Sequence, residues 1–316
     1  MTKLERIIIS SPPIDFFIRK SKNVILPGFH GVPLFDVLKF LFKQLSQEGL
    51  NVRAAAISYN LLMAIPPFLI FLFTLIPYFP FHTEFTRELL RLTHDLTPNQ
   101  TTYIWVRDFI DGFTQPRNGL LSFGFILAVI FSSNAMLGIM RSFDRSLHAL
   151  HKGKRNFIKF RWTAIRLTAL VATLLIASVL LLITQKTLLR WLNIQNNSFR
   201  FWIASLRWLV ILALFYYGIG FIYRYAPAVK IKWRIGSPGT TLATLLMVTV
   251  TVIFSYWVKN FNNYNKIYGS IGTVLILMSS VYINALVLLI GFELNVSISH
   301  LKSDAEHRRL REEKSK

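Results

Sequence analysis

Six long apolar stretches alternate with polar, mostly basic segments along this chain of 316 residues. The last stretch is the clearest, because residues 270–292 contain no Lys, Arg, Asp or Glu. A helix of that length and composition can cross the ~30 Å hydrocarbon core of a lipid bilayer. The pattern therefore predicts an all-α, polytopic membrane protein with a six-helix transmembrane bundle. The predicted spans are residues 54–80, 120–140, 164–184, 202–223, 238–258 and 270–292.

A shorter helix is predicted ahead of the first span, at residues 34–47. Its leucines recur at helical spacing on one face, whereas Asp36, Lys39 and Lys43 lie on the other. Such an amphipathic helix lies either on the cytoplasmic membrane surface or against the cytoplasmic ends of the bundle, and the two positions are compatible. The leucines of the apolar face are Leu34, Leu38, Leu41 and Leu45.

Two further features concern the first span and the loop after it. Pro66 and Pro67 lie in the middle of span one, where their missing N–H groups should bend the helix. The loop at residues 81–119 is long, and Thr83 and Thr97 are candidate starts of one or two short helices. A helical outer loop is therefore expected.

Basic residues gather in alternate segments between the spans. Of 36 Lys and Arg residues, 25 fall in the N-terminal segment, the 2–3 and 4–5 loops and the C-terminal tail, against 9 in the other three loops. Because Lys and Arg are retained on the cytoplasmic side, both the N and C termini are predicted to be cytoplasmic. The same alternation accounts for the net charge of +21 without one basic patch, which argues against nucleic-acid binding.

Composition narrows the class further. Hydrophobic residues make up 53% of the chain and charged residues 16%, as is typical of a membrane protein. The absence of cysteine excludes disulfides and thiolate metal sites, and without a nucleotide-binding motif no cofactor is expected. We expect one six-span domain at residues 53–295. A basic segment at 1–52 precedes it, and a charged cytoplasmic tail at 296–316 follows.

Several short motifs together resemble the YihY/BrkB family of bacterial inner-membrane proteins. The resemblance extends from Arg53 to Asn295 and departs from the family pattern at Ser280 and Asp144, where Trp and Asn are expected. The motifs are Arg53-Ala54-Ala55-Ala56 with Ser58-Tyr59, Ser132-Ser133-Asn134 with Met140-Arg141 and Asp144-Arg145, Tyr223-Arg224-Tyr225-Ala226-Pro227 with Trp233 and Pro238-Gly239, Asn260-Phe261-Asn262-Asn263-Tyr264-Asn265, Tyr268-Gly269-Ser270-Ile271-Gly272 and Gly291-Phe292-Glu293-Leu294-Asn295.

The resemblance implies a six-helix protein of the bacterial inner membrane without an agreed activity. Some members carry the labels virulence factor or ribonuclease BN. A metal-dependent nuclease needs several His, Asp or Glu side chains that converge on a metal. The seven histidines form no metal-binding motif and are divided between the two sides of the predicted membrane, so neither a metal site nor ribonuclease activity is expected.

Arg53 and Glu293 form a candidate ion pair. Arg53 begins span one and Glu293 follows span six, so both are predicted at the cytoplasmic end of the bundle. An acid at that depth needs a partner or contact with water, and the planar guanidinium of Arg matches a carboxylate well. In one alternative the two residues form an ion pair that closes this end of the bundle. In the other, Arg53 is one of the basic residues retained on the cytoplasmic side and Glu293 is solvated.

Asn60, Asn134 and Asn284 lie inside spans one, two and six. An unpaired amide in hydrocarbon costs several kcal/mol, so these side chains should face the bundle interior. They form either a polar pathway for a solute or hydrogen bonds between helices, and we favour the second account.

The densest basic group follows span two. It is a candidate contact surface for anionic lipid headgroups on the cytoplasmic side, at about 1 kcal/mol per residue. Ordinary retention of positive charge is the alternative. The residues are Arg141, Arg145, Lys152, Lys154 and Arg155.

Two classes of function follow, and neither is an enzyme. The first is a transport-class protein that moves or exports a lipid-like or amphiphilic solute, passively or with an ion gradient. The second is a scaffold that binds anionic lipid or partner proteins without transport. Membrane lipids are the expected partners, nucleic acid is not, and the oligomeric state stays open. The predicted location is the inner (cytoplasmic) membrane of a bacterium.

Overall fold

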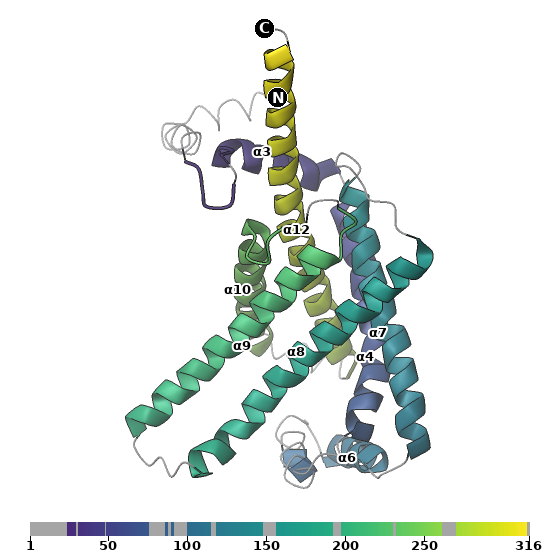
Figure 1. Cartoon of the computed structure of the whole chain (residues 1–316). Coiled ribbons are helices and arrows are strands. Elements are labelled where there is room, and N and C mark those ends of the chain that lie inside the picture. Colours follow the sequence, from purple (N-terminus) through teal and green to yellow (C-terminus); the bar gives the residue numbers. More distant parts are fainter. Residues whose placement is uncertain are drawn as a thin grey trace. The chain divides into compact units, whose positions relative to one another are not determined.

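Helices make up nearly all of the described chain. The structure is a computed structural model, and it describes residues 24–29, 31–47, 49–75, 86–87, 90–91, 100–114, 118–147, 156–191, 197–229, 232–260 and 270–314. These residues contain helices and connecting turns but no β-strand. The helices are α3 (Leu34–Gln47), α4 (Leu50–Leu75), α6 (Gln100–Thr114), α7 (Asn118–Ser146), α8 (Phe157–Trp191), α9 (Asn197–Tyr225), α10 (Pro238–Asn260) and α12 (Ser270–Lys314) (Figure 1).

Six of these helices are long and apolar enough to cross a membrane, namely α4, α7, α8, α9, α10 and α12. They coincide with the six stretches predicted from hydrophobic pattern, so the all-α, six-span fold class is confirmed. The helix predicted at residues 34–47 is α3, and α6 lies within the loop predicted at 81–119. The side of the membrane on which the termini lie stays a prediction.

The first spanning helix, α4, passes through Pro66 and Pro67 without a break. Each proline lacks an N–H, so the carbonyl groups of Leu62 and Met63 lose their usual partners within the helix. The prolines therefore do not end α4, and the bend expected at this point stays a prediction.

The last helix, α12, is 45 residues long. At a rise of 1.5 Å per residue its length is roughly 67 Å, about twice the thickness of a bilayer core. Its first half is the predicted sixth span, and its second half covers residues 296–314, where the sequence predicted a charged tail. That tail is thus a largely exposed helical extension of the last span.

Contacts divide the chain into two compact units that interleave in the sequence. Unit 1 comprises residues 1–56, 140–155 and 216–316, and unit 2 comprises residues 57–139 and 156–215. Unit 1 therefore contains the start of α4, the ends of α7 and α9, and all of α3, α10 and α12. The division of the chain into a basic segment, one six-span domain and a tail stays a prediction.

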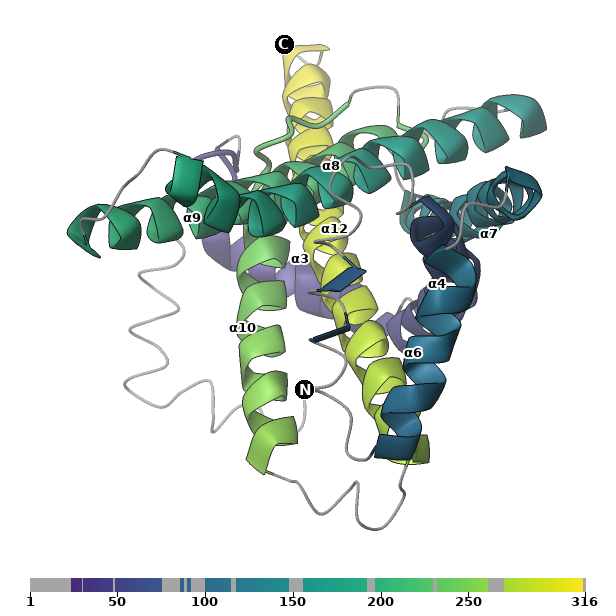
Figure 2. The ribbon, with the colours of Figure 1, turned by 90° about the horizontal axis from the view of Figure 1, so that it is seen from below.

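In unit 1, α12 is the element on which the others pack. Helix α10 lies beside it in both ribbon views (Figures 1 and 2). Helix α3 contacts α12 and leaves Leu38 and Phe42 exposed. The amphipathic helix thus contacts the bundle and also keeps a second apolar surface. The cluster between α3 and α12 consists of Phe29, Val32, Val37, Leu41, Leu294 and Ile298.

In unit 2, α7 approaches α4 closely and shares a hydrogen bond with α8. A Cβ added to Gly138 on α7 would lie 2.9 Å from Nδ2 of Asn60, so α4 and α7 approach closely at this glycine. The Arg161 guanidinium on α8 donates to Oδ1 of Asn134 on α7, at 2.6 Å. The Asn134 amide thus has a partner on an adjacent helix, as expected in a membrane interior.

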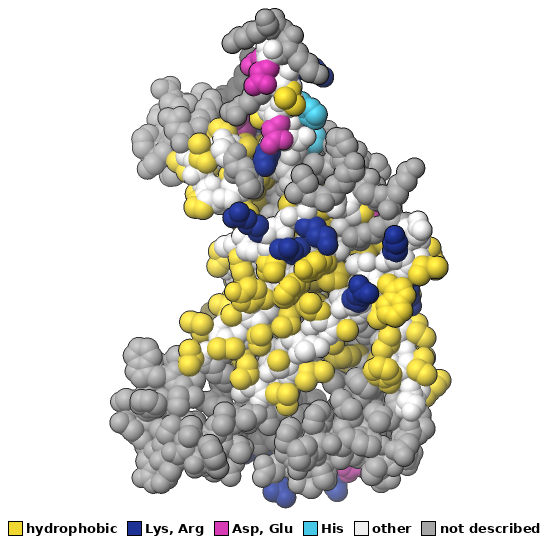
Figure 3. All heavy atoms as spheres, viewed as in Figure 1, with side chains coloured by type: hydrophobic (Ala, Val, Ile, Leu, Met, Phe, Trp, Pro, Cys, Tyr) yellow, Lys and Arg dark blue, Asp and Glu magenta, His cyan; other side chains and the backbone are white. Residues whose placement is uncertain are grey.

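Large apolar side chains cover much of the surface of the spanning helices (Figure 3). Phe123 and Leu209 are 61% and 63% exposed, and Val252 on α10 is 63% exposed. Side chains of this size would cost free energy in water but not against lipid tails. The surface composition agrees with the assignment of these helices to a membrane.

Gly239 and Gly291 allow the close contact between α10 and α12. A Cβ on Gly239 would collide with the carbonyl oxygen of Gly291, and one on Gly291 would lie 2.6 Å from Cβ of Ala243. We expect Gly291→Ala to lower the free energy of unfolding in detergent by about 1–3 kcal/mol, the usual cost of overpacking. The control is Gly112→Ala on α6, where an added Cβ meets nothing within 4 Å. Equal stability of the two variants would contradict this close packing.

Candidate functional site

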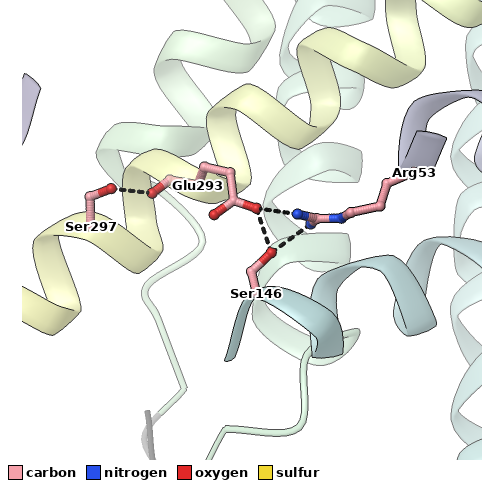
Figure 4. A network of polar contacts seen from close by, with 4 residues as sticks. All are labelled: Arg53, Ser146, Glu293 and Ser297. Atoms are coloured by element: carbon pink, nitrogen blue, oxygen red, sulfur yellow. Dashed lines mark hydrogen bonds and ion pairs between the residues drawn. The ribbon is translucent and has the colours of Figure 1, made fainter. Parts of the chain in front are cut away.

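Arg53 and Glu293 form a buried ion pair in unit 1. Arg53 Nη1 lies 2.8 Å from Glu293 Oε1, and the two side chains are 2% and 0% exposed. Arg53 is in the first turn of α4, whereas Glu293 is 240 positions further along the chain, on α12 (Figure 4). The structure therefore brings together the two residues that the sequence singled out as a candidate pair.

Ser146, the last residue of α7, completes this polar network. Its hydroxyl oxygen accepts a hydrogen bond from Arg53 Nη2 at 2.5 Å, and its proton is donated to Glu293 Oε1. One turn further along α12, the Ser297 hydroxyl donates to the backbone carbonyl of Glu293 at 2.7 Å. The network thus joins α4, α7 and α12.

Burial makes this pair energetically different from an ion pair on a surface. Removing each charge from water costs several kcal/mol, and the attraction between the charges compensates only when further hydrogen bonds satisfy both groups. Ser146 supplies such bonds to both partners. The loss of either charge would leave the other buried without its counter-ion, so the contact depends on both residues being ionised.

Aromatic rings pack around the same turn of α12. Phe292 stacks on Phe143 with ring centroids 3.8 Å apart, and Trp233 meets Phe292 edge-on at 5.3 Å. The Tyr223 hydroxyl, on α9, donates to the backbone carbonyl of Leu288 at 2.6 Å. These rings surround the residue next to Glu293 with apolar atoms, which strengthens the electrostatic interaction of the ion pair.

A second buried network centres on Asn295. Its Oδ1 accepts from the backbone N–H of Gly239 at 2.9 Å, and its Nδ2 donates to Oγ of Ser237 at 2.8 Å. The Ser237 hydroxyl also accepts from the backbone N–H of Thr240 at 3.3 Å, which is the geometry of a helix N-cap. Asn295 therefore satisfies polar groups at the start of α10 and fixes that end to α12.

The three asparagines predicted inside the bundle are all half-buried. Asn60 and Asn134 belong to unit 2, where Asn134 accepts the hydrogen bond from Arg161. Asn284 belongs to unit 1 and donates to the Ser280 carbonyl on its own helix, at 2.9 Å. Their role as a polar pathway stays a prediction.

Of the basic group after span two, the structure describes Arg141 and Arg145, whose side chains are both exposed on α7. Asp144, between them, accepts a hydrogen bond from the backbone N–H of Ala228 at 2.9 Å. It thereby fixes the segment that follows α9, and an asparagine could accept the same bond. The other three members of the group lie outside the described residues: Lys152, Lys154 and Arg155.

Sequence reasoning missed several partners in these networks. Tyr223 and Asn295 belong to the motifs that resemble the family, and nothing else in the sequence indicated them. Ser146 and Ser237 gave no signal, because serine is common in and near membrane helices. Their importance follows only from the contacts that the folded chain creates.

Among the described residues, no three His, Asp or Glu side chains gather in a way that could hold a metal ion. His300 Nδ1 lies 3.1 Å from Asp304 Oδ2 on the same helix, and its ring stacks on Phe40 with centroids 4.9 Å apart. This histidine therefore takes part in the contact between α3 and α12.

Comparison with known proteins gives a match over most of the chain. A family model described as virulence factor BrkB matches residues 41–316. YfkH of Bacillus subtilis (strain 168), whose name calls it ribonuclease-like, is 32% identical over 84% of this chain and 96% of its own length. A UPF0761 membrane protein of Tolumonas auensis is 25% identical over 82% of this chain and 84% of its own. A UPF0761 membrane protein of Haemophilus influenzae is 23% identical over 84% of this chain and 96% of its own length. No solved structure matches the chain.

Arg53 and Glu293 should be strongly coupled in stability. We expect Arg53→Met or Glu293→Leu alone to lower the free energy of unfolding in detergent by about 3–5 kcal/mol, because one buried charge remains. The double variant should lose much less than the sum of the two. The control is the same comparison of single and double variants at the exposed pair Arg107–Asp111, whose charged atoms lie 3.5 Å apart. Its coupling energy should be below about 1 kcal/mol. Additive losses at Arg53 and Glu293 would rule out the coupling.

Asn295 and Asn284 should differ in their contribution to stability, although both are asparagines on α12. Asn295→Leu leaves the Gly239 N–H and the Ser237 hydroxyl without their partner, and we expect a loss of about 1–3 kcal/mol in the free energy of unfolding. Asn284→Leu removes only a bond to its own helix, so its loss should be smaller. Denaturant unfolding of the two purified variants measures this difference, and a larger loss for Asn284→Leu would contradict the assignment.

Proposed function

The chain belongs to the BrkB family of membrane proteins, and from that premise we propose that it is a transport-class protein that moves a lipid-like or amphiphilic solute. The family match agrees with the resemblance drawn from the motifs. We place the protein in the inner membrane of a bacterium, with both termini and the Arg53–Glu293 pair on the cytoplasmic side. The excess of basic residues in alternate segments supports this orientation.

The observation that carries the proposal is the buried ion pair at the end of a membrane span. Well-packed apolar residues would hold three helices together at least as well as a buried ion pair does. Ionisable groups within membrane segments are commonly functional, in pathways and gates. We therefore assign Arg53, Ser146 and Glu293 to a closure at the cytoplasmic end of the solute route, which opens when the pair separates.

The chain carries no nucleotide-binding motif, so its driving force would be the solute gradient or an ion gradient. Protonation of Glu293 would remove the attraction that holds Arg53 and would leave Ser146 with a neutral carboxyl as its acceptor. A proton gradient is therefore one way in which this closure could be driven. In this account Asn60, Asn134 and Asn284 are the polar groups of the interior.

The second candidate function is a scaffold that binds anionic lipid or partner proteins and moves nothing. The observation that favours it is the outer face of α3, where Leu38 and Phe42 are exposed beside the exposed Lys39 and Lys43. Apolar and basic side chains on one exposed helix suit the surface of an anionic membrane. We do not extend the ribonuclease-like name of the Bacillus relative to this chain, and we expect it not to be an enzyme.

Lipid movement in proteoliposomes distinguishes the two functions. We expect the wild-type protein to accelerate the transfer of headgroup-labelled phospholipid between leaflets by at least about tenfold over protein-free vesicles, measured by chemical quenching of the outer label. The Arg53→Met/Glu293→Leu variant should fold but fall to the protein-free rate, because apolar side chains keep the three helices packed and leave no charge pair whose separation opens the route. The control Arg107→Gln/Asp111→Asn, which removes an exposed pair, should keep the wild-type rate. If phospholipid transfer in wild-type vesicles is no faster than in protein-free vesicles, the result contradicts transport and favours the scaffold function.

A further inference from the structure

Cationic side chains gather around one tyrosine at the end of α9. The guanidinium carbon of Arg224 lies 5.6 Å from the centre of the Tyr225 ring, and Nζ of Lys232 lies 4.9 Å from the same centre. Arg234 follows two residues later and is exposed. Two positive charges thus share one aromatic ring, and a third lies close to them in sequence.

No acidic residue occurs near these charges in the sequence. Residues 145–292 contain seventeen Lys and Arg residues but no Asp or Glu. The acids that border this stretch are Asp144 and Glu293, which are bonded to Ala228 N–H and to Arg53. Among the described residues, Nε of Arg224 is buried without a hydrogen-bond partner. The stretch that carries the cluster therefore has an excess of positive charge, which favours a negatively charged ligand.

The backbone holds two of these cations in place. Trp233, between Lys232 and Arg234, donates from Nε1 to the Ser299 hydroxyl on α12 at 2.8 Å and packs against Phe292. Lys232 and Arg234 flank this tryptophan in the chain, and both are exposed. The tryptophan thus anchors to α12 the segment that carries the two cations.

The depth of the cluster indicates the kind of ligand. The apolar span on α9 ends at Tyr225, and tyrosine is enriched where a span meets the lipid headgroups. We infer that Arg224, Tyr225, Lys232 and Arg234 form a binding site for the phosphate headgroup of an anionic phospholipid. The site uses residues other than the basic group after span two, and it requires no movement of solute through the protein.

Lipid binding by the full-length protein in neutral detergent tests the inference. The probes are phosphatidylglycerol, phosphatidylcholine and water-soluble glycerol phosphate, with retained lipid measured by native mass spectrometry. We expect the wild type to prefer phosphatidylglycerol. Lys232→Gln/Arg234→Gln should weaken its binding roughly thirtyfold, at about 1 kcal/mol per removed charge. Binding of phosphatidylcholine should stay the same.

Two controls separate a built site from diffuse positive charge. Lys302→Gln/Arg311→Gln removes two exposed charges from the extension of α12 and should change phosphatidylglycerol affinity less than twofold. Tyr225→Leu keeps every charge but removes the ring between the cations, and should weaken binding about threefold or more. Equal losses in the two charge variants, or no effect of Tyr225→Leu, would overturn the site. Glycerol phosphate that competes at the same concentration as the lipid would overturn the assignment to a headgroup.

Discussion

A salt bridge that is almost completely removed from solvent constrains three helices of this protein at once. Arg53 at the start of α4 and Glu293 on α12 contact each other directly, and Ser146 at the end of α7 bonds to both. In surroundings of low dielectric constant neither charge is tolerated alone. The ion pair therefore holds the first turn of α4 against α12.

The other contacts of unit 1 are built on the same helix. Asn295 fixes the start of α10, Ser299 accepts a hydrogen bond from Trp233, and Leu294 and Ile298 pack against α3. One continuous helix thus acts as a membrane span in its first half and as a support for surrounding segments in its second. A disturbance at Glu293 would reach these segments through packed side chains, which gives a physical basis for linking the ion pair to movement of the helix ends.

The uneven distribution of charge links the fold to its lipid surroundings. Between Asp144 and Glu293 the chain has seventeen basic residues but no acids, so its cations have no carboxylate close to them in sequence. Anionic headgroups are the natural counter-ions for cations at the ends of membrane spans. The two border acids instead hold protein structure together, since Asp144 binds a backbone N–H and Glu293 binds Arg53. Both acids therefore serve contacts within the protein, and the proposed counter-ions of the basic residues are lipid headgroups.

The sequence by itself determined the six spans, the amphipathic α3 and the family, because apolar runs and helical spacing are local properties that hydrophobic burial enforces. It also singled out Arg53 and Glu293, because a charged side chain at the end of a membrane span needs either a partner or contact with water. Only the tertiary structure decided that Ser146 bonds both charges, that Asn295 bonds to the start of α10, and that Asn284 bonds to its own helix. These contacts form between residues that are distant in sequence and come within about 3 Å of one another in the fold. No periodic pattern of residue types along the chain predicts such a hydrogen bond.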